Sequence, residues 1–186
     1  MVRHVDKVVI AVSLALNVAL ALEVRSLKKS APPRNNSFLQ VGQTVPAVVA
    51  QNSQNALVSV RYSDVRVPSI LYVLRPECGW CGRNLANLNE LRRQTKGRYR
   101  VVLLSLTEGD FSDYGGRDEV LVVTKETRLA LKLGGTPQTI VVSPEGKVQR
   151  NWFGAYADNT NEVESALGVT LPGLLPAKPV ATATYQ

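Results

Sequence analysis

Two cysteines, Cys78 and Cys81, are the only thiols in this chain of 186 residues. A pair at this spacing suits three kinds of chemistry: half of a metal site, a small structural disulfide, or a redox pair that cycles between dithiol and disulfide. A zinc site needs about four ligands, and the single histidine, His4, lies far away near the amino terminus. A structural disulfide stays open as an alternative, although one that closes so short a loop restricts the unfolded chain only slightly.

The surroundings of the pair favour the redox interpretation. The apolar run Ser69–Leu74 precedes it, and a stretch with leucine at every third position follows it, which predicts a strand and then a helix that begins near Cys78. Free backbone N–H groups at a helix start favour the thiolate, which lowers the cysteine pKa below its usual value of about 8.5. We therefore predict that Cys78 is the nucleophile and Cys81, one helical turn further on, the buried resolving thiol. Trp80, between them, is predicted to be an exposed platform for a substrate, whereas Trp152 is expected to pack in the core.

The rest of the sequence predicts a sheet of mixed direction that is covered on both faces. Strands are expected at 45–50, 57–62, 69–74, 99–106, 119–124, 139–142 and 148–153, and helices at about 78–96, 125–133 and 161–167. The run 99–106 is apolar on both faces, as in a central parallel strand, and a Ser-Pro-Glu-Gly-Lys turn joins the last two strands as a hairpin. This order of elements predicts an α/β fold.

The amino-terminal arm contains an uncharged run of fifteen residues, Val8–Leu22, somewhat shorter than the ~20 apolar residues that span a bilayer. We expect residues 1–24 to form a single membrane anchor or, alternatively, a signal segment cleaved near 19–21. A buried soluble helix is disfavoured, because no polar face interrupts the run. The Lys and Arg residues after the run outnumber those before it, which conflicts with export of the domain. A short basic amino terminus more often directs export, so we expect a domain on the periplasmic or extracytoplasmic side of the cell membrane.

Composition separates this arm from a nearly neutral domain. Of the net charge of +7, most belongs to residues 1–37, which carry six Lys or Arg and two Asp or Glu. The remainder has no basic stripe with interleaved aromatics, so we expect no nucleic-acid partner. Residues 25–40 are predicted to be a linker, residues 41–170 the folded domain, and the Pro- and Ala-rich residues from Leu171 to 186 a disordered tail.

In these features the sequence resembles proteins of the thioredoxin fold and, among them, the membrane-anchored TlpA-like thiol–disulfide oxidoreductases. The resemblance covers about residues 41–167 and rests on three motifs: Cys78-Gly79-Trp80-Cys81 after a strand, GGTPQTIVVSPEGKV at 134–148, and Phe153-Gly154-Ala155 after the hairpin. It implies a thioredoxin-like three-layer sandwich, preceded here by the apolar helix, in which the Thr136–Pro137 peptide is cis and faces the dithiol. It also implies a groove around Cys78 in which an extended partner pairs like an added strand. That groove is formed by Trp80, Thr136, Pro137, Phe153, Gly154 and Ala155.

The resemblance further implies that Cys78 and Cys81 are catalytic and that the protein reduces the disulfide of a partner protein. It implies no cofactor beyond the Cys78–Cys81 disulfide, no metal, and a separate electron-donor protein. Two positions depart from the pattern: Tyr72 replaces a buried aspartate of thioredoxin, and Asn84 replaces a glutamate of many TlpA-like reductases. Both usual proton acceptors for the resolving thiol are therefore missing, which leaves open a membrane-tethered binding module with a passive disulfide. A peroxiredoxin is disfavoured, because the stretch YVLRPEC lacks a threonine before the cysteine.

Overall fold

The computed structural model describes residues 13–14, 16–20, 23 and 38–177, and the chain divides into two units, Met1–Asn36 and Ser37–Gln186. In the first unit all described residues are helical, and Asn17 Nδ2 donates a hydrogen bond to the Ser13 carbonyl at 2.8 Å. Most of the predicted anchor, 1–24, lies outside the described residues. Among the helices that are described, we find none with the length and hydropathy needed to cross a membrane.

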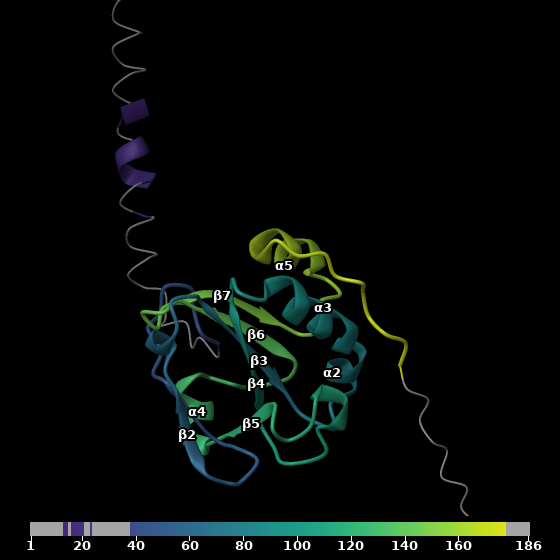
Figure 1. Cartoon of the computed structure of the whole chain (residues 1–186). Coiled ribbons are helices and arrows are strands. Elements are labelled where there is room, and N and C mark those ends of the chain that lie inside the picture. Colours follow the sequence, from purple (N-terminus) through teal and green to yellow (C-terminus); the bar gives the residue numbers. More distant parts are fainter. Residues whose placement is uncertain (1–12, 15, 21–22, 24–37, 178–186) are drawn as a thin grey trace, which may run out of the picture. The chain divides into compact units, whose positions relative to one another are not determined.

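The second unit is built on one seven-stranded sheet with the strand order β2-β1-β5-β4-β3-β6-β7 (Figure 1). The strands are β1 (Val48–Gln51), β2 (Leu57–Val60), β3 (Ser69–Leu74), β4 (Arg100–Ser105), β5 (Val120–Val123), β6 (Gln138–Val142) and β7 (Val148–Phe153). The central strands β3, β4 and β5 are parallel, and the pairs β1–β2, β1–β5, β3–β6 and β6–β7 are antiparallel. The mixed sheet and the closing hairpin that the sequence predicts are confirmed.

The helices are α2 (Gly79–Arg83), α3 (Leu85–Thr95), α4 (Lys125–Ala130) and α5 (Thr160–Leu167), and two 3₁₀ turns lie at 62–64 and 112–114. The single helix expected at 78–96 is therefore wrong. It breaks at Asn84, whose N–H is shared between the carbonyls of Trp80 and Cys81 at 3.0 and 3.2 Å. The helix expected at 125–133 also ends early, because Lys132 adopts a φ of 48° that an α-helix does not allow.

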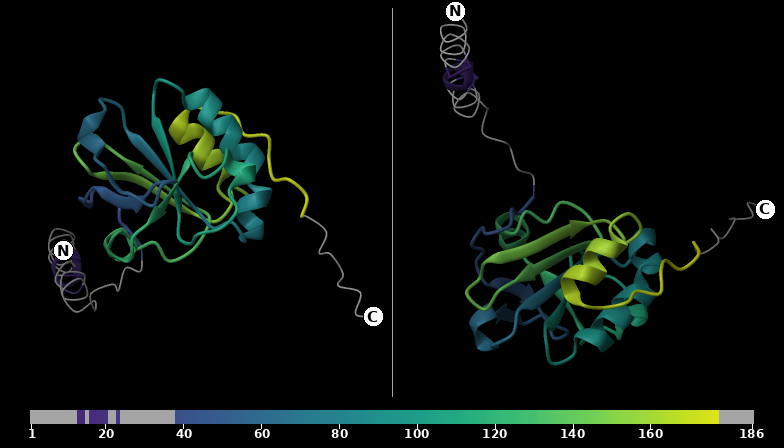
Figure 2. Two further views of the ribbon diagram at one scale, coloured as in Figure 1. Left: turned by 60° about the horizontal axis from the view of Figure 1, so that its bottom comes forward. Right: turned by 90° about the horizontal axis from the view of Figure 1, so that it is seen from above.

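Both faces of the sheet are covered, and β3 contributes to both cores because side chains alternate along a strand. Ile70, Tyr72 and Leu74 enter the cluster on the face of α3 and α5. Leu71 and Val73 enter the cluster on the opposite face, together with the residues that follow α4. Figure 2 shows α3 and α5 side by side on one side of the sheet. The domain is thus a three-layer α/β sandwich, as expected.

The domain begins before the predicted end of the linker at residue 40. Leu39 is buried in the core, and the ring of Phe38 lies 4.5 Å from that of Phe153. The aromatic and aliphatic side chains of these two residues bury apolar surface against the domain, which the linker composition of the preceding residues did not predict.

The chain after α5 also differs from the predicted unpacked tail, which is wrong for residues 171–177. Leu171 is buried in the core beside α3 and α5. The Gly173 N–H donates to Asn87 Oδ1 at 2.8 Å, and the Leu175 N–H donates to the Arg83 carbonyl at 2.7 Å. We call residues 170–177 the C-terminal strap. It runs along α3 toward α2, as the yellow ribbon in Figure 1 shows. Residues 178–186 of the predicted tail lie outside the described residues.

Candidate redox site

The two cysteines lie where β3 gives way to α2. A turn after Leu74 leads to Cys78, the N-cap residue of α2, with an extended backbone at φ −79° and ψ 104°. Its Sγ accepts a hydrogen bond from the Cys81 N–H at 3.2 Å, so the sulfur satisfies one of the free N–H groups of the helix start. The predicted start of the helix at the first thiol is confirmed.

Cys78 and Cys81 form a disulfide with a Cα–Cα distance of 5.2 Å. The two cysteines are not equally exposed: Cys81 is fully buried at 0% exposure, whereas Cys78 is partly exposed. A partner can therefore reach Cys78 but not Cys81. This asymmetry fits the predicted division into a nucleophile and a resolving thiol.

The structure brings the predicted groove residues together beside Cys78. The Thr136–Pro137 peptide is cis, as the resemblance implies, and the Thr136 carbonyl oxygen lies 3.5 Å from Cys78 Sγ. The Pro137 carbonyl accepts a hydrogen bond from the Gly154 N–H at 2.8 Å, which joins the two halves of the groove. All six predicted groove residues line one cavity of about 270 Å³, namely Trp80, Thr136, Pro137, Phe153, Gly154 and Ala155.

The two tryptophans have the different environments that the sequence predicts. Trp80 is 53% exposed, and the Arg83 guanidinium lies over its ring at 4.5 Å from the centroid, a cation–π contact. Trp152 is buried and its indole N–H donates to Glu162 Oε1 at 2.8 Å. Trp80 also lines a second cavity of about 460 Å³, which includes Cys78.

The loop after β4 contacts Pro76 and Glu77, the two residues directly before Cys78. Gly109 lies against the ring of Pro76, and a Cβ at this glycine would come within 2.6 Å of Pro76 Cγ. The Thr107 hydroxyl lies 3.5 Å from the Glu77 carboxylate. The absence of a side chain at Gly109 therefore allows the close approach that holds the turn before Cys78.

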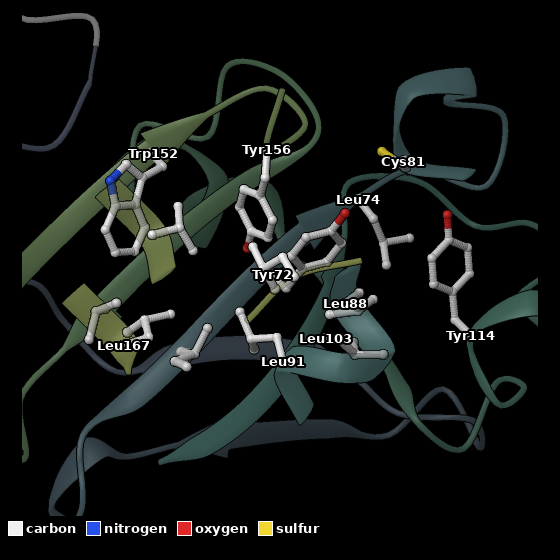
Figure 3. Packing of buried hydrophobic residues seen from close by; sticks show 14 of the residues in the cluster. Tyr72, Leu74, Cys81, Leu88, Leu91, Leu103, Tyr114, Trp152, Tyr156 and Leu167 are labelled. Carbon is white, nitrogen blue, oxygen red and sulfur yellow. The ribbon is translucent and has the colours of Figure 1, made fainter. Parts of the chain in front are cut away.

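A buried polar cluster lies in the core beneath α2. The Asn84 side chain donates to the Tyr72 hydroxyl at 3.0 Å, and its Oδ1 accepts from Asn87 Nδ2 at 2.9 Å and from the Tyr156 N–H at 3.3 Å. The Tyr156 hydroxyl is 2.5 Å from Thr139 Oγ1. Figure 3 shows the rings of Tyr72 and Tyr156 in the core cluster to which Cys81 also belongs. The sequence singled out Tyr72 and Asn84, but their partners on α3 and after β7 carried no sequence signal.

This cluster is electrically neutral. Among the described residues, no buried polar side chain is an Asp or a Glu. Burial raises the pKa of Tyr72 and of Tyr156, so both hydroxyls keep their protons at neutral pH. The core beneath Cys81 thus offers hydrogen bonds but no group that accepts a proton at neutral pH. In the described part of the chain, no group of three or more His, Cys, Asp or Glu is placed to hold a metal ion.

We expect the fold to lose stability steeply in alkali. Burial raises the pKa of Tyr62 and of Tyr114 to about 12, and raises that of Tyr72 and Tyr156 as well. Above the unfolded pKa of about 10, the unfolded chain loses protons that the folded chain keeps, so each tyrosine lowers the free energy of unfolding by about 1.4 kcal/mol per pH unit. Below pH 10 this contribution is fully present.

Urea unfolding at a series of pH values measures how steeply the free energy of unfolding falls with pH. A Tyr156→Phe variant, with one titrating group fewer, is expected to show a shallower decline, and an equal decline would contradict the assignment.

Comparisons with known proteins rest on structure alone. No protein-family model matches this chain, and no curated protein matches it significantly. Among solved structures, the thioredoxin domain of a thiol-disulfide oxidoreductase from Bacteroides vulgatus matches with a TM-score of 0.56 and 18% identity, covering 69% of this chain and 99% of that one. A thiol:disulfide interchange protein from Bacteroides sp. matches with a TM-score of 0.54 and 19% identity, covering 71% and 92%. A thio-disulfide isomerase from Thermus thermophilus matches with a TM-score of 0.50 and 18% identity, covering 72% and 100%.

Likeness at this level of identity concerns the fold. The strand order, the cysteine pair at the start of α2 and the cis proline opposite it agree with the resemblance drawn from the sequence. The domain described by residues 38–177 therefore has the thioredoxin fold.

Proposed function

We propose that this protein is a thiol–disulfide oxidoreductase that reduces protein disulfides through Cys78 and Cys81. The observation that carries the proposal is the position of Cys78, which is partly exposed and whose Sγ lies 3.5 Å from the carbonyl oxygen of Thr136 at the groove. Cys81 is buried behind it and bonded to it. The fold is also that of solved proteins described as thiol-disulfide oxidoreductases, which supports the proposal.

The reaction exchanges one disulfide for another. The Cys78 thiolate attacks one sulfur of the partner disulfide, a mixed disulfide forms, and the released partner sulfur takes up a proton. Cys81 then loses its proton and attacks Cys78 Sγ, which breaks the mixed disulfide and releases the second partner thiol. Two electrons pass from the cysteine pair to the partner, and the pair ends as the disulfide seen here.

In the second step Cys81 has to lose its thiol proton before it can attack, so the group that accepts this proton matters. Since Tyr72 and Asn84 are neutral and no described carboxylate is buried, the proton of Cys81 leaves to water or to the departing partner thiolate. We therefore propose that resolution of the mixed disulfide is the slow step near neutral pH.

We also propose that residues 1–24 anchor the protein in the cell membrane, with the domain on the extracytoplasmic side. The fifteen-residue uncharged run at 8–22 and the basic residues before it support this arrangement. With a single cysteine pair in the sequence, a separate protein dithiol has to reduce the disulfide again. The partners are thus one protein with a disulfide and one electron donor.

A second candidate function is a tethered binding module on the same fold. The neutral Tyr72–Asn84 pair favours it, because a resolving thiol without a proton acceptor suits a disulfide that does not cycle. In that case the groove beside Trp80 holds an extended segment of a partner, and the cysteines are a passive link.

The reduction potential of the Cys78–Cys81 pair separates these proposals. We expect a value at or below about −230 mV, as for a reductant, from equilibration of the full-length chain in glutathione and dithiothreitol buffers. A value of about −120 to −180 mV would instead indicate an oxidant or isomerase. A disulfide that neither buffer reduces would favour the binding module.

A further inference from the structure

The C-terminal strap is fixed along α2 and α3 by side chains at matching helical positions. The Gln94 amide pairs with both backbone groups of Thr170, at 2.8 and 3.0 Å. Asn87, two turns earlier, accepts from the Gly173 N–H at 2.8 Å. Arg83 lies four residues before Asn87. Its backbone carbonyl accepts a hydrogen bond from the Leu175 N–H at 2.7 Å, and its side-chain Nε donates to the Leu175 carbonyl at 3.0 Å. Asn87 and Gln94 are seven residues apart and lie on one side of α3. Since residues 170, 173 and 175 contact residues 94, 87 and 83 in that order, the strap runs antiparallel to α3 and α2 in a defined register.

This register brings the end of the strap to the redox site. Leu175, Pro176 and Ala177 line the cavity of about 460 Å³ together with Cys78 and Trp80. Arg83 links the strap to Trp80, because its side chain lies over the Trp80 ring and also donates to Leu175. The strap is thus part of the surroundings of Cys78.

The cavity is suited to an apolar side chain. Trp80 is 53% and Leu175 41% exposed, so two large apolar side chains face solvent beside a reactive sulfur. Pro76 and Tyr114 add apolar surface, and the charged residues of the lining are Arg83 and the exposed Glu77 and Asp113. The volume is within the range of about 300–1,000 Å³ that is usual for ligand sites. Arg83, the cation of the lining, is already held by Trp80 and Leu175.

The chemistry at Cys78 specifies which molecule brings that side chain. When Cys78 Sγ bonds to a sulfur of the partner and the partner's own S–S bond breaks, the neighbours of that partner cysteine lie one Cα–Cα step of about 3.8 Å away. Their side chains therefore come within reach of the two cavities that Trp80 lines. We propose that the cavity between Trp80 and Leu175 is a subsite for a large apolar side chain next to the partner's cysteine. This inference rests on the proposed function, and it makes the strap a determinant of specificity distinct from the groove at Thr136–Pro137.

Two disulfide-linked peptides test this subsite. They differ only in the residues on both sides of the cysteine, which are leucine in one and serine in the other. We expect the reduced full-length chain to react about tenfold faster with the leucine peptide, because one apolar side chain in a pocket is typically worth a factor of this order. In Leu175→Asp this preference is expected to fall to about twofold or less, and in Leu175→Ala to an intermediate value. Rates are measured by acid quench and mass spectrometry.

The controls separate the subsite from the reaction itself. Leu129→Asp changes a leucine that is 69% exposed on α4 and is expected to keep the wild-type preference. Hydroxyethyl disulfide, which has no side chain for the cavity, measures the intrinsic reactivity of Cys78 in each variant, and the preference is the ratio of the two peptide rates within one variant, so a change in that reactivity cancels. If the wild type shows no preference, or if both Leu175 variants keep it, the subsite is wrong while the redox function stands. If no disulfide reacts with the wild type, the proposed function fails as well.

Discussion

Replacing Cys78 with serine is expected to abolish disulfide exchange, with a loss of at least about a thousandfold in rate, because the attacking sulfur is removed. Replacing Cys81 with serine has a different outcome. Cys78 still attacks the partner, but no thiol is left beneath it to break the mixed disulfide, so partners stay covalently attached. Non-reducing electrophoresis of the membrane fraction, followed by mass spectrometry of the reducible adducts, measures this trapping.

The double variant Cys78→Ser/Cys81→Ser is the matched control. We expect it to trap no partner, since it lacks both the attacking sulfur and the resolving thiol. A Cys81→Ser protein that captures nothing would argue strongly against an oxidoreductase. If the double variant keeps the binding of a partner and any phenotype of the wild type, the groove rather than the thiols carries the function.

Replacing Asn84 with alanine is expected to lower the free energy of unfolding by about 3–5 kcal/mol. Three groups lose the same partner at once: the Tyr72 hydroxyl, the Asn87 amide and the Tyr156 N–H. All three lie in the buried core, where no solvent is at hand to replace the lost hydrogen bonds, so each group is left without a partner at a cost in free energy. Urea unfolding, monitored by circular dichroism, measures the difference.

Asn89, on the helix that follows Asn84, offers a control. Its side chain is exposed on α3, so Asn89→Ala is expected to change the free energy of unfolding by no more than about 0.5 kcal/mol. Equal effects at the two asparagines would show that the buried cluster adds nothing to stability. A large effect at Asn84 alone would show that the buried hydrogen bonds of this residue stabilise the domain.

The sequence predicted those elements that have a local signal. β3 and β7 have the expected bounds, because each is a β-type run between a proline or glycine turn and a second break. The break between α2 and α3 was not predicted, because the leucines at every third position begin directly after Asn84 and no proline between Cys78 and Lys96 marks a helix end. The cause of the break is tertiary, since the Asn84 side chain is held by β3 and by the residues after β7.

The same distinction applies to the site. The cysteine pair and the cis proline have short motifs, and the resemblance placed both correctly. The C-terminal strap was missed because its proline- and alanine-rich composition is typical of a tail. What fixes it are backbone groups of the strap and side chains of α2 and α3, up to 92 positions apart in the sequence. No local pattern reports such pairs.

The late position of the strap also orders the assembly of the site in time. Synthesis proceeds from the amino terminus, so β3, α2 and Pro137 are made before Leu175. A chain that ends before the strap, whether nascent or clipped by a protease, has Cys78 and the residues of the groove but lacks three of the residues that line the second cavity. Immature and damaged molecules would then react with partners that the finished protein discriminates against.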